Sequence, residues 1–198
     1  TGILNVQLDD HPYARGSFSF YVPESYDGNT KLPVVIALHG GYGHGRDYLW
    51  YWLREARTRG FMVAAPSSRG ITWSIMGADV DASLLNEMLG YIQGRWYIDE
   101  KRIFLTGMSD GATYALKIAM SEYSPFSAYA VIACVLPPYD LRDVGGRRIF
   151  WVHGAGDWMF PVIYAKNGAA RLTEAKAAVN LKIIPDLYHA HPREKNDG

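Results

Sequence analysis

Short runs of continuous apolar residues recur along the chain, and such runs are typical of strands buried on both faces of a parallel sheet. They occupy residues 33–38, 61–65, 102–106, 129–136, 149–152 and 181–184. Two earlier stretches, 3–8 and 17–22, flank the turn-rich segment 9–12. This arrangement predicts an antiparallel pair of strands at the edge of the sheet.

Segments with helical character lie between these strands. Apolar residues recur every four positions from Val80 to Ile92, and Asp79 can cap the start of that helix. Further helices are expected over 112–120 and over the alanine-rich stretch 164–179. The alternation predicts the α/β class, with a mostly parallel central sheet, helices on both faces and an antiparallel N-terminal edge. No repeat or linker interrupts it, so we expect one domain over residues 1–198.

Composition places the chain among ordinary globular proteins and leaves its oligomeric state open. It has 198 residues, of which 48% are hydrophobic and 20% charged, and its formal net charge is zero. No basic run stands out, which argues against a nucleic-acid partner, and no apolar stretch approaches the length of a membrane span. No signal peptide is visible, which favours the cytoplasm, although the chain begins with Thr1 rather than Met. The single cysteine, Cys134, is expected to pack as a small apolar group in a buried strand.

Residues 107–111, Gly-Met-Ser-Asp-Gly, stand between an apolar strand and a helix-forming run. A strand, a sharp turn and a helix are the context of a nucleophile elbow, in which a strained turn projects the serine hydroxyl from the sheet edge. Only small residues fit two positions before and after the serine, and Gly107 and Gly111 supply them. The alternative is a glycine-rich loop with an incidental serine, but the flanking elements favour Ser109 as a nucleophile.

A serine hydroxyl needs a base, which is typically a histidine oriented by a carboxylate. Asp157 and His189 follow the last two buried strands, so the order along the chain is Ser, Asp, His. Asp157 could instead cap a turn. His191 competes as the base, but the following Pro192 restricts its backbone, and His189 lies nearer the strand end. A metal at this His-x-His pair would lack further ligands, so we expect no metal and no cofactor.

The glycine-rich loop 39–43 follows the first buried strand and can supply a backbone N–H to a developing oxyanion. We expect one donor from Gly41 and the other from Asp110, next to the nucleophile, with His39 holding the loop in place. A phosphate cradle is the alternative reading, but the loop lacks the Gly-Lys-Ser/Thr ending of a P-loop.

Aromatic residues on the loops beside the elbow can shape a substrate pocket. Tyr42, Trp73 and Trp158 are the candidates for contacts with the substrate. They can equally well seal the top of the core, and the sequence does not separate these two roles.

Four motifs in this order resemble the α/β-hydrolase fold, and most closely its small carboxylesterase/phospholipase-type and dienelactone-hydrolase-like members. They are Leu38–Gly41, Gly107–Gly111, His153–Asp157 with Pro161, and Pro185–His189. The resemblance implies a nucleophile at Ser109, an acid at Asp157, a base at His189 and oxyanion donors at Gly41 and Asp110. Dienelactone hydrolases use cysteine at the elbow, so serine here favours an esterase. Family members carry a closing helix after the histidine loop, and none is evident before Gly198.

These residues predict a serine hydrolase that cleaves a small-molecule carboxylic ester through an acyl-enzyme. The same triad serves thioesterases and peptidases, and the sequence does not separate the three reactions. A hydrolase-fold protein that binds a ligand without turnover is a further alternative, although such proteins typically lack one of the triad residues or an oxyanion glycine.

Overall fold

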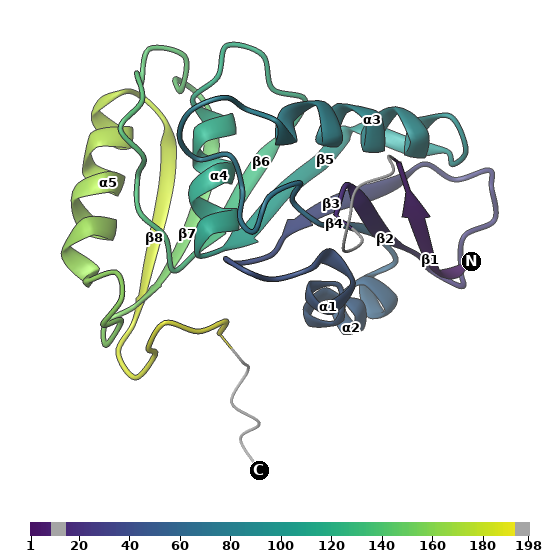
Figure 1. Cartoon of the computed structure of the whole chain (residues 1–198), viewed down its shortest axis with the longest axis horizontal. Helices are drawn as coiled ribbons and strands as arrows, with labels where there is room; N and C mark the ends of the chain where they lie inside the picture. The colour runs from purple at the N-terminus through teal and green to yellow at the C-terminus, as the bar shows by residue number, and fades with distance from the viewer. Residues whose placement is uncertain (9–14, 193–198) are drawn as a thin grey trace.

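The computed structural model describes residues 1–8 and 15–192, and within them eight strands form one sheet (Figure 1). The strands stand in the order β1-β2-β4-β3-β5-β6-β7-β8. Their bounds are β1 Gly2–Gln7, β2 Ser17–Val22, β3 Leu32–Leu38, β4 Met62–Pro66, β5 Ile98–Met108, β6 Ala128–Ile132, β7 Arg148–Gly154 and β8 Ala178–Ile184. β2 runs antiparallel to β1 and β4, and all other neighbours are parallel. This confirms the mostly parallel sheet with an antiparallel N-terminal edge.

Helices pack on both faces of the sheet, as the alternation of elements predicts. They are α1 Gly45–Tyr48, α2 Trp50–Arg59, α3 Asp81–Gln93, α4 Asp110–Ala119 and α5 Val162–Glu174. α3, α4 and α5 bury one face, and α1 and α2 lie against the other, below the sheet in Figure 1. Alternate residues of β3 serve the two cores, since Ile36 packs toward α4 and Ala37 toward α2. Burial on both faces explains why the central strands are apolar throughout.

Two predicted elements end four or more residues earlier than expected. The helix expected over 164–179 ends at Glu174, because Lys176 takes a left-handed backbone (φ 69°) and Ala178 already pairs with Arg148 in the sheet. The strand expected over 129–136 ends at Ile132, so Cys134 lies just beyond it. Cys134 is nevertheless fully buried, and burial raises the pKa of its thiol well above its usual value.

Parallel strands bring their following loops to one edge of the sheet. The loops after β3, β5, β7 and β8 therefore converge, and they carry the glycine-rich loop, Ser109, Asp157 and His189. In the part of the chain that the structure describes, no helix has both the length and the apolar character needed to cross a bilayer.

Candidate active site

Ser109 occupies a strained turn between β5 and α4. Its backbone lies at φ 55° and ψ −119°, a conformation that costs a non-glycine residue free energy and that clusters at functional sites. A Cβ at Gly107 would lie 2.5 Å from the carbonyl carbon of Gly111. A Cβ at Gly111 would lie 2.4 Å from the carbonyl oxygen of His39. Both glycines are therefore required by close packing of backbone, as the elbow motif predicts.

Three side chains from separate loops meet at this turn in hydrogen-bonding succession. His189 Nε2 lies 3.0 Å from Ser109 Oγ, and His189 Nδ1 lies 2.9 Å from Asp157 Oδ2. The imidazole is 11% exposed and the carboxylate is fully buried. The structure thus brings together the serine, the aspartate and the first of the two candidate histidines.

Asp157 is held by its own loop. Its Oδ1 accepts hydrogen bonds from the backbone N–H groups of Met159 and Phe160, at 3.0 and 2.8 Å, which leaves Oδ2 for His189. The ring of Phe160 meets the His189 ring edge-on, with centroids 5.2 Å apart. These contacts orient both partners before any substrate arrives.

A second histidine, His153, supports the same carboxylate and was not singled out by the sequence. It is fully buried at the end of β7, and its Nε2 donates to the carbonyl oxygen of Phe160 at 2.8 Å. The same nitrogen lies 3.5 Å from Asp157 Oδ2. His153 begins the His153–Asp157 motif, but the motif gives this histidine no role, because it does not show which way the ring points.

The glycine-rich loop lies directly against the elbow. A Cβ at Gly40 would be 3.5 Å from Ser109 Cβ, which places the backbone of this loop beside the serine. The N–H of Asp110 is the first of α4 and has no acceptor within the helix. The side chain of Asp110 turns toward the loop instead, where its Oδ2 accepts from Thr72 Oγ1 at 2.5 Å and would be 2.7 Å from a Cβ at Gly41.

His39 is buried and holds the glycine-rich loop, as expected. Its Nε2 accepts the backbone N–H of Ser68 at 3.1 Å, so Nδ1 carries the proton and donates to the carbonyl oxygen of Gly40 at 2.6 Å. Burial lowers the pKa of His39 to about 4. The ring is therefore neutral at physiological pH and contributes structure rather than charge.

The three aromatic candidates separate into two groups. Tyr42 and Trp158 are exposed, at 79% and 74%, beside the glycine-rich loop and Asp157 respectively. Trp73 is only 2% exposed; it stacks on Tyr114 and donates its Nε1–H to the carbonyl oxygen of His39 at 2.8 Å. For Trp73 these contacts favour the alternative role, in which its ring packs in the core and supports the loop from below.

Two surface hollows lie in this region, one beside the glycine-rich loop and one beside His189. A hollow of about 200 Å³ runs along Gly40 and Gly41, and another of about 500 Å³ runs along His189 and Leu187. Tyr51 of α2 and Met108 line both. Helix α2 had no clear apolar stripe in the sequence, so Tyr51 could not be placed near the elbow.

The competing histidine, His191, points elsewhere. Its ring lies in an aromatic cluster on α1 and α2, with centroids 5.1 Å from Tyr51 and 5.8 Å from Trp52. Burial lowers the pKa of His191. Among residues 1–8 and 15–192, no three His, Cys, Asp or Glu side chains are grouped as a metal ion would require.

Comparison with known proteins supports the fold. No family model matches the chain. A bifunctional acetylxylan esterase/xylanase of Neocallimastix patriciarum is 25% identical over 162 residues, which cover 76% of this chain and 23% of that protein. The chain thus spans about a quarter of the curated relative that it matches.

Two solved structures superpose on most of the chain. The acetyl xylan esterase of Aspergillus awamori matches with a TM-score of 0.80 at 15% identity, over 98% of this chain and 96% of that one. A thermostable esterase matches with a TM-score of 0.72 at 21% identity, over 84% of this chain and 50% of that one. Together with the sheet order and the elbow, these likenesses show that the chain has the α/β-hydrolase fold.

Proposed function

We propose that this chain is a serine hydrolase that cleaves carboxylic esters through a covalent acyl-enzyme. The observation that carries the proposal is the unbroken succession of Ser109 Oγ, the His189 ring and the Asp157 carboxylate, at 3.0 and 2.9 Å. A serine is a weak nucleophile until a base takes its proton, and this arrangement supplies both the base and the group that orients it.

The steps follow from which nitrogen carries the proton. Asp157 accepts from Nδ1–H of His189, so Nε2 is free to take the hydroxyl proton as Ser109 Oγ attacks the ester carbonyl. The backbone N–H groups of Gly41 and Asp110 stabilise the resulting oxyanion. His189 then returns the proton to the leaving alcohol, which leaves an acyl-enzyme. Water, deprotonated by the same nitrogen, releases the acid and restores the serine.

The smaller of the two hollows, beside the glycine-rich loop, favours a small acyl group. The hollow along Gly40 and Gly41 is about 200 Å³, which suits a short chain on the oxyanion side. The names of two similar proteins, both acetylxylan esterases in whole or part, agree with an acetyl group as the smallest such acyl. We propose small-molecule esters as the substrate class, and residues 1–198 as one catalytic domain, because every described strand joins the same sheet.

The proposal is tested with p-nitrophenyl acetate and a fluorophosphonate probe. The wild type should turn over the ester and take up one probe per chain, whereas Ser109→Ala should do neither while its circular dichroism and melting temperature stay unchanged. Ser25→Ala, at an exposed serine far from the elbow in sequence, is the matched control and should behave as the wild type. Turnover by Ser109→Ala, or an inert and unlabelled wild type, would contradict the proposal.

Parallel kcat/KM measurements on an ester, a thioester and an amide with the same acetyl group then separate the three reactions that this triad can perform. We expect the ester to be preferred over the amide, because alcohols leave more readily than amines. A preference for the thioester or the amide would retain the mechanism and change the bond that is cleaved.

A further inference from the structure

A cavity of about 430 Å³ lies between α3, α4 and the segments that follow α4 and β6. Helix α4 starts at Ser109 with its N-terminus, whereas the cavity is lined by its far end, from Lys117 to Met120. Eight residues of helix separate Ser109 from Lys117, which corresponds to roughly 12 Å along the axis. The cavity is therefore a separate place from the triad, on the face that α3 and α4 cover.

The walls of this cavity are apolar and already ordered. Leu85, Leu89, Met120 and Phe126 line it, and each is no more than 6% exposed within the fold. Sites for small molecules in proteins are typically concave, mostly apolar and about 300–1,000 Å³ in volume, with a few polar groups that orient the ligand. The cavity has this size and this kind of wall.

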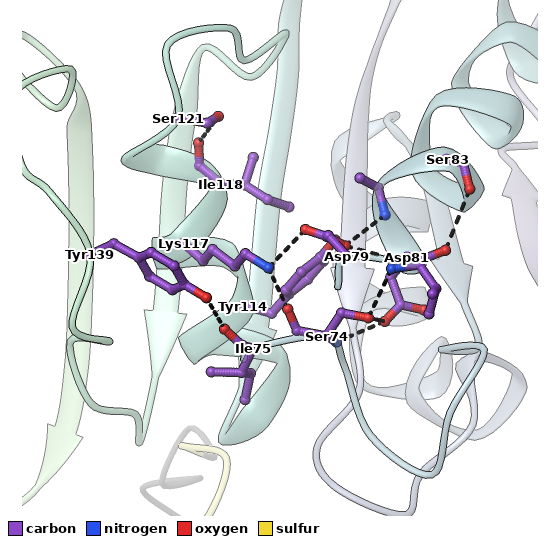
Figure 2. A network of polar contacts seen from close by, with 12 residues as sticks. Ser74, Ile75, Asp79, Asp81, Ser83, Tyr114, Lys117, Ile118, Ser121 and Tyr139 are labelled. Atoms are coloured by element: carbon purple, nitrogen blue, oxygen red, sulfur yellow. Dashed lines mark hydrogen bonds and ion pairs between the residues drawn. The ribbon is translucent and has the colours of Figure 1, made fainter. Parts of the chain in front are cut away.

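The polar residues of the lining include one basic group, Lys117, beside Asp79, Asn86, Ser121 and Asp140. Lys117 Nζ lies 2.9 Å from Asp79 Oδ2 and donates to the carbonyl oxygen of Ser74 at 2.5 Å, as Figure 2 shows. The side chain of Lys117 is only 15% exposed. Among the residues that the structure describes, Asp79 and Ser74 supply its hydrogen-bond acceptors, and the rings of Tyr114 and Tyr139 lie 5.5 Å from the same nitrogen. An ammonium has three N–H donors, so one N–H is not used in these hydrogen bonds.

The charges around the cavity select a neutral ligand. The Asp79 carboxylate neutralises Lys117, and its Oδ1 already accepts from the hydroxyl of Tyr114 at 2.7 Å (Figure 2). Asp140 also lines the cavity and is paired with Arg142, with Nε to Oδ2 at 2.9 Å. A carboxylate ligand would face two carboxylates across one lysine, and a cationic ligand would compete with the lysine itself.

We propose that this cavity is a second small-molecule site, for a neutral and mainly apolar compound whose carbonyl oxygen accepts a hydrogen bond from Lys117 Nζ. An aryl ketone or an uncharged aryl ester has this chemistry. The site does not depend on turnover at Ser109, so its test is independent of the proposed esterase activity.

The probe is 2-acetylnaphthalene, titrated into the whole chain and followed by ligand-observed NMR and equilibrium dialysis. We expect saturable binding of one molecule, unchanged in Ser109→Ala and in fluorophosphonate-treated protein. Lys117→Met should weaken it by about 10- to 100-fold, the value of one hydrogen bond to a charged donor. Lys101→Met, at an exposed lysine of β5, should leave it unchanged, and 2-naphthoate at neutral pH should bind at least tenfold more weakly than the ketone.

Lys117→Met leaves Asp79 without its ionic partner, and a resulting misfolding would also reduce binding. A second variant therefore tests the cavity while this ion pair is kept. Ala82→Trp places a large ring at an exposed position of α3 that lines the cavity, and it should abolish probe binding without unfolding the helix. Absence of saturable binding in the wild type would overturn the proposal. So would binding that competes with the fluorophosphonate, or binding that survives Ala82→Trp in folded protein.

Discussion

Two loops at the same edge of the sheet bring a histidine close to Ser109, and the two rings differ in what surrounds them. His39, after β3, is 1% exposed and has both nitrogens occupied by backbone groups, the N–H of Ser68 and the carbonyl of Gly40. His189, after β8, has a carboxylate on one nitrogen and the serine hydroxyl on the other.

This difference shows how the surroundings of a histidine decide whether it is structural, as His39 is, or suited to proton transfer, as His189 is. A buried imidazole between backbone groups gains nothing from a second proton, so it stays neutral and fixes the loop. An imidazole between a carboxylate and a hydroxyl can accept a proton on one side while the carboxylate stabilises the charged ring on the other. Substitutions at the two histidines and at the groups beside them test this contrast.

Removal of the His189 imidazole, in the loop after β8, should lower kcat more than any other change. His189→Ala is expected to lower kcat for p-nitrophenyl acetate by about 10⁴- to 10⁶-fold, because no other described side chain can take the proton from Ser109. His191→Ala, in the aromatic cluster on α1 and α2, is the control and should stay within tenfold of the wild type. Equal losses in the two variants would remove the distinction between them.

Loss of the Asp157 carboxylate, which orients His189, should have the next largest effect on kcat. Asp157→Asn keeps the shape of the side chain but favours the wrong tautomer of His189, so kcat should fall by about 10⁴-fold with little change in KM. The melting temperature should change modestly, since the amide oxygen can still accept from the N–H groups of Met159 and Phe160. A kcat within tenfold of the wild type would show that Asp157 acts only as a turn cap.

His39, in the loop after β3, should affect the free energy of unfolding rather than the catalytic rate. Burial lowers the pKa of His39 to about 4, whereas an unfolded histidine titrates near 6.5. Between these values the unfolded chain binds a proton that the folded chain does not, so the free energy of unfolding falls as the pH drops from 6.5 toward 4. The decrease attributable to this residue is about 3 kcal/mol at the lower end.

Urea denaturation of the wild type and of His39→Gln across this pH range measures the contribution of His39 to the free energy of unfolding. Other titrating groups are common to both proteins, so the extra slope should be present in the wild type and absent in the variant. Parallel stability curves would contradict the assignment of His39 as a buried neutral ring.

The smallest effect should come from the contact that joins the glycine-rich loop to the elbow. Thr72 Oγ1 donates to Asp110 Oδ2, which sits against Gly41. In Thr72→Val this carboxylate is left without its donor beside the developing oxyanion, and kcat should fall about tenfold with KM unchanged. Thr72→Ser keeps the hydroxyl and should restore the rate; a loss in both variants would point to packing instead.

Several features of the fold and site could be predicted from the sequence, because they depend on residue types and their spacing. The central strands are apolar throughout since both faces are buried, and the elbow requires Gly107 and Gly111 because any Cβ would meet backbone. Asp79 accepts the N–H groups of Asp81 and Ala82 at the start of α3, as a capping residue does. The cap at Asp79 and the contact between Gly107 and Gly111 act within a few residues of their own positions, whereas Gly111 also lies against the backbone of His39.

Other features could not be predicted from the sequence, because they depend on which residues pack beside one another in the fold. Trp73 has the same chemistry as Trp158, and only its stacking on Tyr114 makes it a buried support. Tyr51 lines the hollows beside His189 and the glycine-rich loop only because of the path of α2. The cavity at Lys117 is formed by segments that the sequence separates by dozens of residues.

The α/β class, the strained serine turn and the order of the three residue types that a hydrolase needs could all be predicted from the sequence. These follow from hydrophobic periodicity and from the steric demands of glycine, which are local. Only the packing of the loops separates the buried Trp73 from the exposed Trp158 and forms the cavity at Lys117. It also brings His189, which the sequence favoured over His191, against Ser109. Those outcomes depend on distances between loops, and distances between loops are set by the packing of the whole sheet and its helices.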